Sequence, residues 1–192
     1  MEISKTFIQQ QLAESIAVKQ KMADEQSDSI AQISQALIKA LGAGGIIYLC
    51  GNGGSAADAQ HVATELVGRY LRERKALPAV ALTTDTSLLT ALANDYEFSR
   101  IFARQVEALV TAKDVVVGIS TSGKSENVIE AIKAARQKGA FTIGFTGSPG
   151  LPLSRETNLC LCVPSRVTPR IQESHITAWH IICDLIEQTF AK

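Results

Sequence analysis

The sequence predicts an α/β fold in which a parallel five-stranded sheet carries helices on both faces. Short apolar runs recur through residues 43–192, each ends in Gly, Ser, Thr or Asn, and a helical pattern follows each run. This alternation is typical of parallel sheets, whose strands are buried on both faces by crossover helices. A helical extension precedes the sheet, because residues 3–42 carry apolar side chains at helical spacing.

The elements are expected in the following order. The helical pattern of residues 3–42 is interrupted by polar residues near 25–28, which predicts two helices. The predicted strands are residues 46–50, 79–82, 115–120, 141–145 and 159–163. A long amphipathic helix is expected from about 170 to 190. With no repeat and no linker, residues 1–192 form a single domain, in which helices (1–42) precede an α/β core (43–192).

The amino-acid composition argues against nucleic acid and membranes as binding partners. The 192 residues contain 19 basic and 19 acidic side chains, so no general positive field would attract nucleic acid or an anionic membrane. The N-terminus lacks the apolar run of a signal peptide, and 18 uncharged apolar residues never follow one another. We therefore expect a cytoplasmic protein that binds neither nucleic acid nor membrane.

The four cysteines are expected to be buried free thiols in a reducing compartment. They are Cys50, Cys160, Cys162 and Cys183. The spacing of Cys160 and Cys162 invites a metal interpretation, but the alternation of NLCLCVP predicts a strand with both thiols on one face, so free thiols are favoured.

Two loops at predicted strand ends are candidates for ligand binding. Ligands of open parallel sheets bind beyond the carboxyl ends of the strands, where helix N-termini present free N–H groups. The first loop, residues 50–55 (CGNGGS), has three glycines that let the backbone approach a ligand, or it is an ordinary tight turn. The second loop, residues 120–125 (STSGKS), offers four hydroxyls that suit a phosphate, or it only caps the following helix.

Both loops also match nucleotide-binding motifs, but the residues around each loop argue against nucleotide binding. Residues 118–125 read G-x-x-x-x-G-K-S, the nucleotide P-loop, but Gly118 lies inside an apolar run rather than at its end. Gly51, Gly53 and Ala56 fit a loose dinucleotide fingerprint, yet no acidic residue ends a second strand about twenty residues later. We expect no nicotinamide cofactor.

A metal site is expected near the helix that follows the first loop. His61 and Glu65 are four residues apart and share a helix face, a spacing that suits either a shared cation or a simple surface hydrogen bond. The other histidines, His175 and His180, lie on the C-terminal helix beside Gln172 and Glu173. Imidazole, carboxylate and amide oxygen together suit zinc or a similar ion.

Five segments together resemble the phosphoheptose isomerases, a zinc-dependent branch of the SIS-domain (sugar isomerase) family: CGNGGSAADAQH, ELVGRY, LTTDTSLLTALANDY, GISTSGKSENV and RIQESH. The resemblance implies a flavodoxin-like sandwich, a homotetramer with sites between subunits, and one zinc ion per subunit. It also implies isomerisation of sedoheptulose 7-phosphate to D-glycero-D-manno-heptose 7-phosphate. That reaction is the first step towards the ADP-heptose of lipopolysaccharide and other bacterial surface polysaccharides.

The same resemblance implies roles for individual residues. Zinc would bind His61, Glu65, Gln172 and His180, and Glu65 and His180 would also carry the proton transfers. Glu65 and Gln172 are expected to touch substrate as well, together with Asn52, Gly53, Gly54, Ser55, Asn94, Asp95, Ser120, Thr121, Ser122 and Ser125. His175 is expected to be structural or to support the site from outside.

Two other functions are considered. A relative of these enzymes is a non-catalytic regulator that binds the bacterial replication initiator, and it lacks the equivalents of Glu65 and His180, which are present here. A sugar-phosphate-sensing domain of a transcription factor would need a DNA-binding module, which the sequence does not contain. The enzyme is therefore favoured.

Gln172 and His180 are far apart along one helix for two ligands of the same ion. Eight residues of helix rise about 12 Å, near the limit at which two side chains reach one ion. We expect either that Gln172 lies at a frayed helix start or that the site is completed across a subunit boundary.

Overall fold

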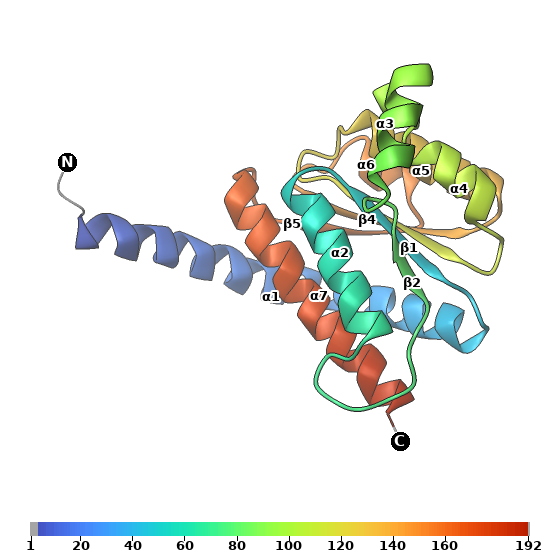
Figure 1. Ribbon diagram of the computed structural model, residues 1–192. Helices are drawn as coiled ribbons and strands as arrows, with labels where there is room; N and C mark the ends of the chain where they lie inside the picture. The colour runs from blue at the N-terminus through green and yellow to red at the C-terminus, as the bar shows by residue number, and fades with distance from the viewer. Residues whose placement is uncertain (1–3, 192) are drawn as a thin grey trace.

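The computed structural model describes residues 4–191 and confirms the predicted α/β architecture (Figure 1). Seven α-helices, one short 3-10 helix and five strands follow one another along this part of the chain. In order they are α1 (Lys5–Gly42), β1 (Ile47–Gly51), α2 (Gly54–Val67), β2 (Ala79–Ala81), α3 (Thr86–Asp95), η1 (Phe98–Arg100), α4 (Ala103–Leu109), β3 (Val115–Ile119), α5 (Glu126–Gln137), β4 (Phe141–Gly147), α6 (Leu153–Glu156), β5 (Leu159–Val163) and α7 (Thr168–Phe190).

The five strands form one parallel sheet in the order β2-β1-β3-β4-β5. The strand order reverses between β1 and β3, which pair directly, with Cys50 opposite Gly118 and Gly51 opposite Ile119. In open α/β sheets this reversal opens a crevice at the carboxyl ends of the two strands. The loops that follow β1 and β3 are therefore neighbours at this crevice.

Helices cover both faces of the sheet and divide the core into two layers. One layer joins α1, α2 and α7 to strand residues such as Leu49 and Phe145. The other joins α4, α5 and α6 to strand residues such as Tyr48 and Val116. Neighbouring strand residues thus supply opposite layers, which is why the strands read as continuous apolar runs.

Gly118 illustrates how closely α5 packs on the sheet. A Cβ atom at this position would lie 2.7 Å from Cγ1 of Val128 on α5. Gly118 lies inside β3, and its missing side chain lets α5 pack closely on the sheet. This position differs from that of the first glycine of a nucleotide P-loop, which follows the end of its strand.

The N-terminal extension is one helix, so the prediction of two helices is wrong. No Gly or Pro occurs between residues 5 and 41, and the polar stretch continues as helix. Ser27 donates its hydroxyl to the carbonyl of Ala23 at 2.6 Å, a bond that is compatible with the helix. Figure 1 shows the first half of α1 extending beyond the rest of the molecule. No helix within residues 4–191 has the length and apolarity to cross a membrane.

The cysteines differ in burial, although all four are free thiols. Cys50 and Cys183 are buried as predicted, whereas Cys160 and Cys162 are only half-buried because β5 is the edge strand. Their Sγ atoms are 3.7 Å apart, which confirms that both lie on one face of the strand. In the described chain, neither thiol belongs to a group of three or more His, Cys, Asp or Glu side chains that could share a metal ion.

His175 is fully buried where α7 packs against β4. Its Nε2 lies 3.3 Å from the carbonyl oxygen of Thr146, and its ring meets Phe145 edge to face at 5.6 Å between centroids. Burial lowers the pKa of His175 to about 4, although the contact with Thr146 opposes this shift. This placement agrees with a structural role.

The lowered pKa of His175 predicts a specific loss of stability in acid. The unfolded chain takes up a proton at this position below pH 6.5, whereas the folded chain does so only near pH 4. Each pH unit lost in this window should therefore remove about 1.4 kcal/mol from the free energy of unfolding. Urea denaturation of wild type and His175→Asn between pH 4.5 and 7 should show a shallower pH dependence in the variant. Parallel curves would contradict the assignment.

Candidate active site

The first candidate loop joins β1 to α2 at the strand reversal. Gly53 has φ +54°, a conformation that side chains with a Cβ atom rarely adopt. A Cβ atom at Gly54 would lie 2.6 Å from Nε2 of Gln172, so a larger residue would displace the side chain that α7 presents there. The glycines therefore allow a close approach between the loop and α7, and the loop is more specialised than an ordinary turn.

A reciprocal pair of amides links the two candidate loops. Asn52 donates Nδ2 to Oδ1 of Asn127 at 2.9 Å, and Asn127 donates Nδ2 back to Oδ1 of Asn52 at 2.8 Å. Asn127 is buried in the first turn of α5 and also accepts a bond from the N–H of Val128 at 3.0 Å. Asn127 was not predicted from the sequence, where its only signal was an amide two residues after the serine-rich loop.

The second candidate loop, between β3 and α5, is tied together by its own hydroxyls. The Oγ atoms of Ser120 and Ser125 are 2.8 Å apart, and the N–H of Lys124 donates to Oγ of Ser122 at 3.2 Å. Ser125 occupies the N-cap position of α5, but its side chain makes no capping bond. A plain helix cap therefore does not account for these hydroxyls, and the loop lies at the positive end of a helix.

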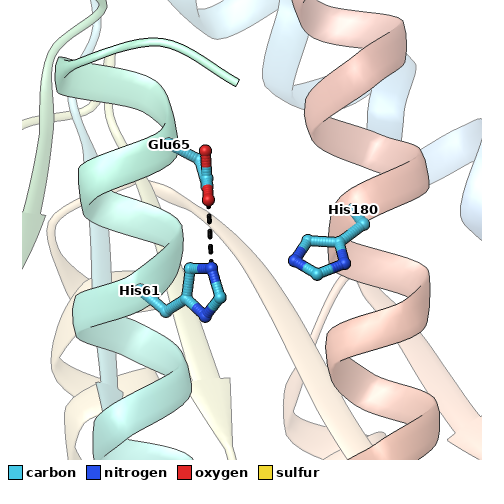
Figure 2. A group of neighbouring side chains, drawn as sticks. All are labelled: His61, Glu65 and His180. Carbon is cyan, nitrogen blue, oxygen red and sulfur yellow. Dashed lines mark hydrogen bonds and ion pairs between the residues drawn. The ribbon is translucent and has the colours of Figure 1, made fainter. Parts of the chain in front are cut away.

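His61, Glu65 and His180 converge between two helices (Figure 2). His61 and Glu65 come from the last turns of α2, and His180 faces them from the middle of α7. His61 Nε2 and Glu65 Oε1 are 3.0 Å apart, and the rings of His61 and His180 have centroids 5.3 Å apart. One ligand atom from each residue lies within 4.8 Å of the others.

These three side chains can hold a metal ion. Two imidazoles and one carboxylate match the donors of catalytic zinc sites, and three protein ligands leave a position for water or substrate. The His61 side chain is 45% exposed and that of Glu65 is 18% exposed, so a small molecule can reach both residues. In residues 4–191 this is the one such convergence of three or more His, Cys, Asp or Glu side chains.

Two further residues border this group, and neither was assigned a role from the sequence. The ring of Tyr70 stacks on His180 with centroids 5.6 Å apart and an angle of 27° between the planes. Asp58 lies one turn before His61 on α2. Burial raises the pKa of Asp58 to about 6, an effect that His61 partly opposes.

Gln172 lies inside α7, four residues after its start at Thr168. The expectation of a frayed helix start at this position is therefore wrong, because the helix extends a full turn before it. The amide of Gln172 lies against Gly54 of the first loop. Completion of the site across a subunit boundary remains a prediction.

Asn94 and Asp95 lie at the end of α3, which carries no buried residue. Figure 1 shows α3 rising away from the sheet after β2. Asn94 donates Nδ2 to Oδ1 of Asp95 at 2.9 Å. Within residues 4–191 neither side chain makes a hydrogen bond to either candidate loop.

The sequence matches the SIS domain family model over residues 10–147. The phosphoheptose isomerase of a Roseiflexus species is 55% identical over 175 residues, which cover 91% of this chain and 89% of the relative. That of Geobacter sulfurreducens is 57% identical over 164 residues, covering 85% and 87%. The chain belongs to the phosphoheptose isomerases.

Solved phosphoheptose isomerase structures share the whole fold. The enzyme from Francisella tularensis superimposes with a TM-score of 0.93 at 38% identity, covering 97% of this chain and all of the other. The enzyme from Neisseria gonorrhoeae gives a TM-score of 0.90 at 45% identity, covering 96% and 98%. The expected resemblance to phosphoheptose isomerases of the SIS-domain family is therefore confirmed along nearly the full chain.

Proposed function

We propose that this protein is a zinc-dependent isomerase that converts sedoheptulose 7-phosphate to D-glycero-D-manno-heptose 7-phosphate. The observation that carries the proposal is the convergence of His61, Glu65 and His180 in a chain that belongs to the phosphoheptose isomerases. The reaction would supply heptose for surface polysaccharide such as lipopolysaccharide. It would take place in the cytoplasm.

The reaction needs a base and an acid beside a bound sugar. A proton must leave the carbon next to the carbonyl and return to its neighbour through an enediol. Glu65 is the proposed base, because its carboxylate lies on the side of α2 that meets α7 and is partly exposed. His180 faces it from α7 and would move protons on the sugar oxygens. A bound zinc ion would polarise the carbonyl and stabilise negative charge on oxygen.

The zinc ligands are proposed to be His61, Glu65 and His180, with Gln172 as the fourth. The first three already converge in one chain. The amide of Gln172 lies beside the first loop, on the same helix as His180 and eight residues before it. This set supplies two nitrogens and two oxygens, which suits zinc.

The two loops are proposed to bind the phosphorylated sugar. Ser120, Thr121, Ser122 and Ser125 would hold the phosphate, since hydroxyls and free N–H groups meet there at a helix N-terminus. Asn52, Gly53, Gly54 and Ser55 would hold sugar hydroxyls in the neighbouring loop. Asn94 and Asp95, at the end of α3, would also contact the sugar.

The protein is further proposed to assemble as a homotetramer. The projecting half of α1 exposes four large apolar side chains, which are Phe7, Ile8, Leu12 and Ile16. Helix α3 likewise has no buried residue. Apolar helix faces of this kind mark contacts with other protein surfaces, and further copies of the chain would cover both.

The proposed base is tested by Glu65→Gln. The variant keeps the side-chain size and one oxygen but loses the basicity, so turnover of sedoheptulose 7-phosphate should fall about 10² to 10⁴-fold. Sugar binding should persist, because the loops are unchanged. The same substitution at Glu156, which pairs with Arg136 on the other face of the sheet, should leave kcat near wild type. Near-normal turnover by Glu65→Gln with zinc bound would place the base elsewhere.

The phosphate site is tested by Ser125→Ala. Loss of one hydrogen bond to a charged group, about 1.5–3 kcal/mol, should raise KM for the sugar phosphate roughly 10- to 100-fold. Zinc content and the free energy of unfolding should change little, because α5 does not use this hydroxyl as a cap. Steady-state kinetics with an unaltered KM would argue against the phosphate assignment.

The metal is tested by chelation. The purified protein should contain one zinc ion per chain by mass spectrometry of the metal, and a chelator should abolish turnover until zinc is restored. His61→Ala and His180→Ala should each lose most of the zinc. Full activity in metal-free protein would refute the zinc requirement. The assignment of the sugar substrate would still be tested by turnover of sedoheptulose 7-phosphate.

A further inference from the structure

The connection between α2 and β2, residues 68–78, runs beside the C-terminal part of α7 (Figure 1). It leaves α2 directly after Glu65 and the last turn of the helix. It thus contacts both helices that supply the convergent side chains, at the end of α2 opposite the candidate loops.

Glu187 of α7 is a fully buried carboxylate that binds this connection through its backbone. Its Oε1 accepts the N–H of Tyr70 at 2.9 Å, and its Oε2 accepts the N–H groups of Leu71 and Arg72, both at 2.7 Å. Successive N–H groups converging on one anion form a backbone nest. Although burial raises the pKa of Glu187, these three bonds hold it below its ordinary value, so the group is ionised at neutral pH.

Arg74, a residue of the same connection, binds both Glu187 and the C-terminal end of α2. Its guanidinium is 1% exposed and lies 3.5 Å from Glu187, measured from Nε to Oε1. Nη2 donates to the carbonyl of Glu65 at 2.6 Å, and Nη1 donates to the carbonyl of Leu66 at 2.8 Å. The last carbonyls of a helix lack partners within the helix, and a cation complements the negative end of its dipole. Arg74 therefore caps α2 at the residue that supplies the carboxylate of the site.

The same contacts also place Tyr70 against His180. Glu187 holds the N–H of Tyr70, and the Tyr70 ring stacks on the imidazole of His180. Glu187 lies seven residues after His180, two turns along the same face of α7. One buried ion pair thus touches the backbone of Glu65, the backbone of Tyr70 and the helix of His180.

We propose that Glu187 and Arg74 are positioning residues that fix α2 against α7. They thereby set the distances among the side chains of His61, Glu65 and His180. Neither residue touches the substrate. The ion pair acts through the backbone of the 68–78 connection and through Tyr70. This inference rests on the proposed zinc-dependent isomerase and names the residues that preorganise its site.

The zinc affinity of the metal-free protein tests this inference independently of turnover. Glu187→Gln keeps the side-chain volume but replaces one acceptor oxygen with an NH2 group, which faces backbone N–H donors. The affinity for Zn²⁺, measured by competition with a chromophoric chelator, should fall about 10- to 100-fold. The kcat with saturating zinc should also fall, while KM for sedoheptulose 7-phosphate should stay within about threefold, because the loops that bind the sugar lie at the other end of α2.

The matched control is Asp184→Asn. Asp184 also joins α7 to the connection, through its 2.6 Å contact with the side chain of Arg72, but it is partly exposed and touches no backbone N–H. Its substitution should leave zinc affinity, kcat and KM near wild type. A loss equal to that of Glu187→Gln would show that any contact here matters and would overturn the specific role of the ion pair.

Arg74 provides a second and graded test in case Glu187→Gln folds poorly. Arg74→Lys keeps the cation near Glu187 and should retain more zinc affinity than Arg74→Met, which keeps only the bulk. Equal affinities for wild type, Glu187→Gln and both Arg74 variants would refute the proposal. If none of these variants gives the wild-type circular dichroism spectrum, the pair serves folding rather than positioning, and the proposal fails. A wild type that binds no zinc would instead refute the proposed function, and this inference would fall with it.

Discussion

The direct pairing of β1 with β3 is the constraint on which the rest of the site depends. The strand order reverses at this pair, so α2 and α5 leave it on opposite faces of the sheet. The two candidate loops are thereby held next to each other, and the amides of Asn52 and Asn127 can join them. A different strand order would separate the loops, whatever residues they contained.

The convergence of His61, Glu65 and His180 depends on a second arrangement, the packing of α2 beside α7 on one face of the sheet. Buried residues such as Val62 and Leu66 fix one side of α2, and His61 and Glu65 occupy the side that meets α7. Helix packing against a sheet sets such separations only approximately. Buried ion pairs contribute little net stability but add specificity in some proteins, which fits the arrangement of Glu187 and Arg74 between these helices.

The sequence predicted those parts of the fold that local pattern determines. Strand positions agree within about two residues, because buried apolar runs end at Gly, Ser or Asn and leave little choice. The break expected near residues 25–28 was wrong, since polar residues without Gly or Pro remain helical when neighbouring turns are packed. His61 and Glu65 were found because their spacing is local. Glu187 was missed because its partners are 115 to 117 residues away, and nothing in the pattern of α7 distinguishes it from a surface glutamate.

The loop after β3 has an energetic consequence of its own. The loop is held by the contact between the Ser120 and Ser125 hydroxyls and by β4, where the N–H of Gly147 donates to the carbonyl of Thr121 at 3.0 Å. A loop that such bonds already order would lose little conformational freedom on binding an anion, so more of the interaction energy would appear as affinity. The bond between the two serines has a competing effect, because a hydroxyl that turns towards a ligand must leave its neighbour. If this loop binds the phosphate as proposed, its selectivity would depend on exchanging one hydrogen bond for a stronger, charge-assisted one, which a neutral hydroxyl of a sugar cannot provide.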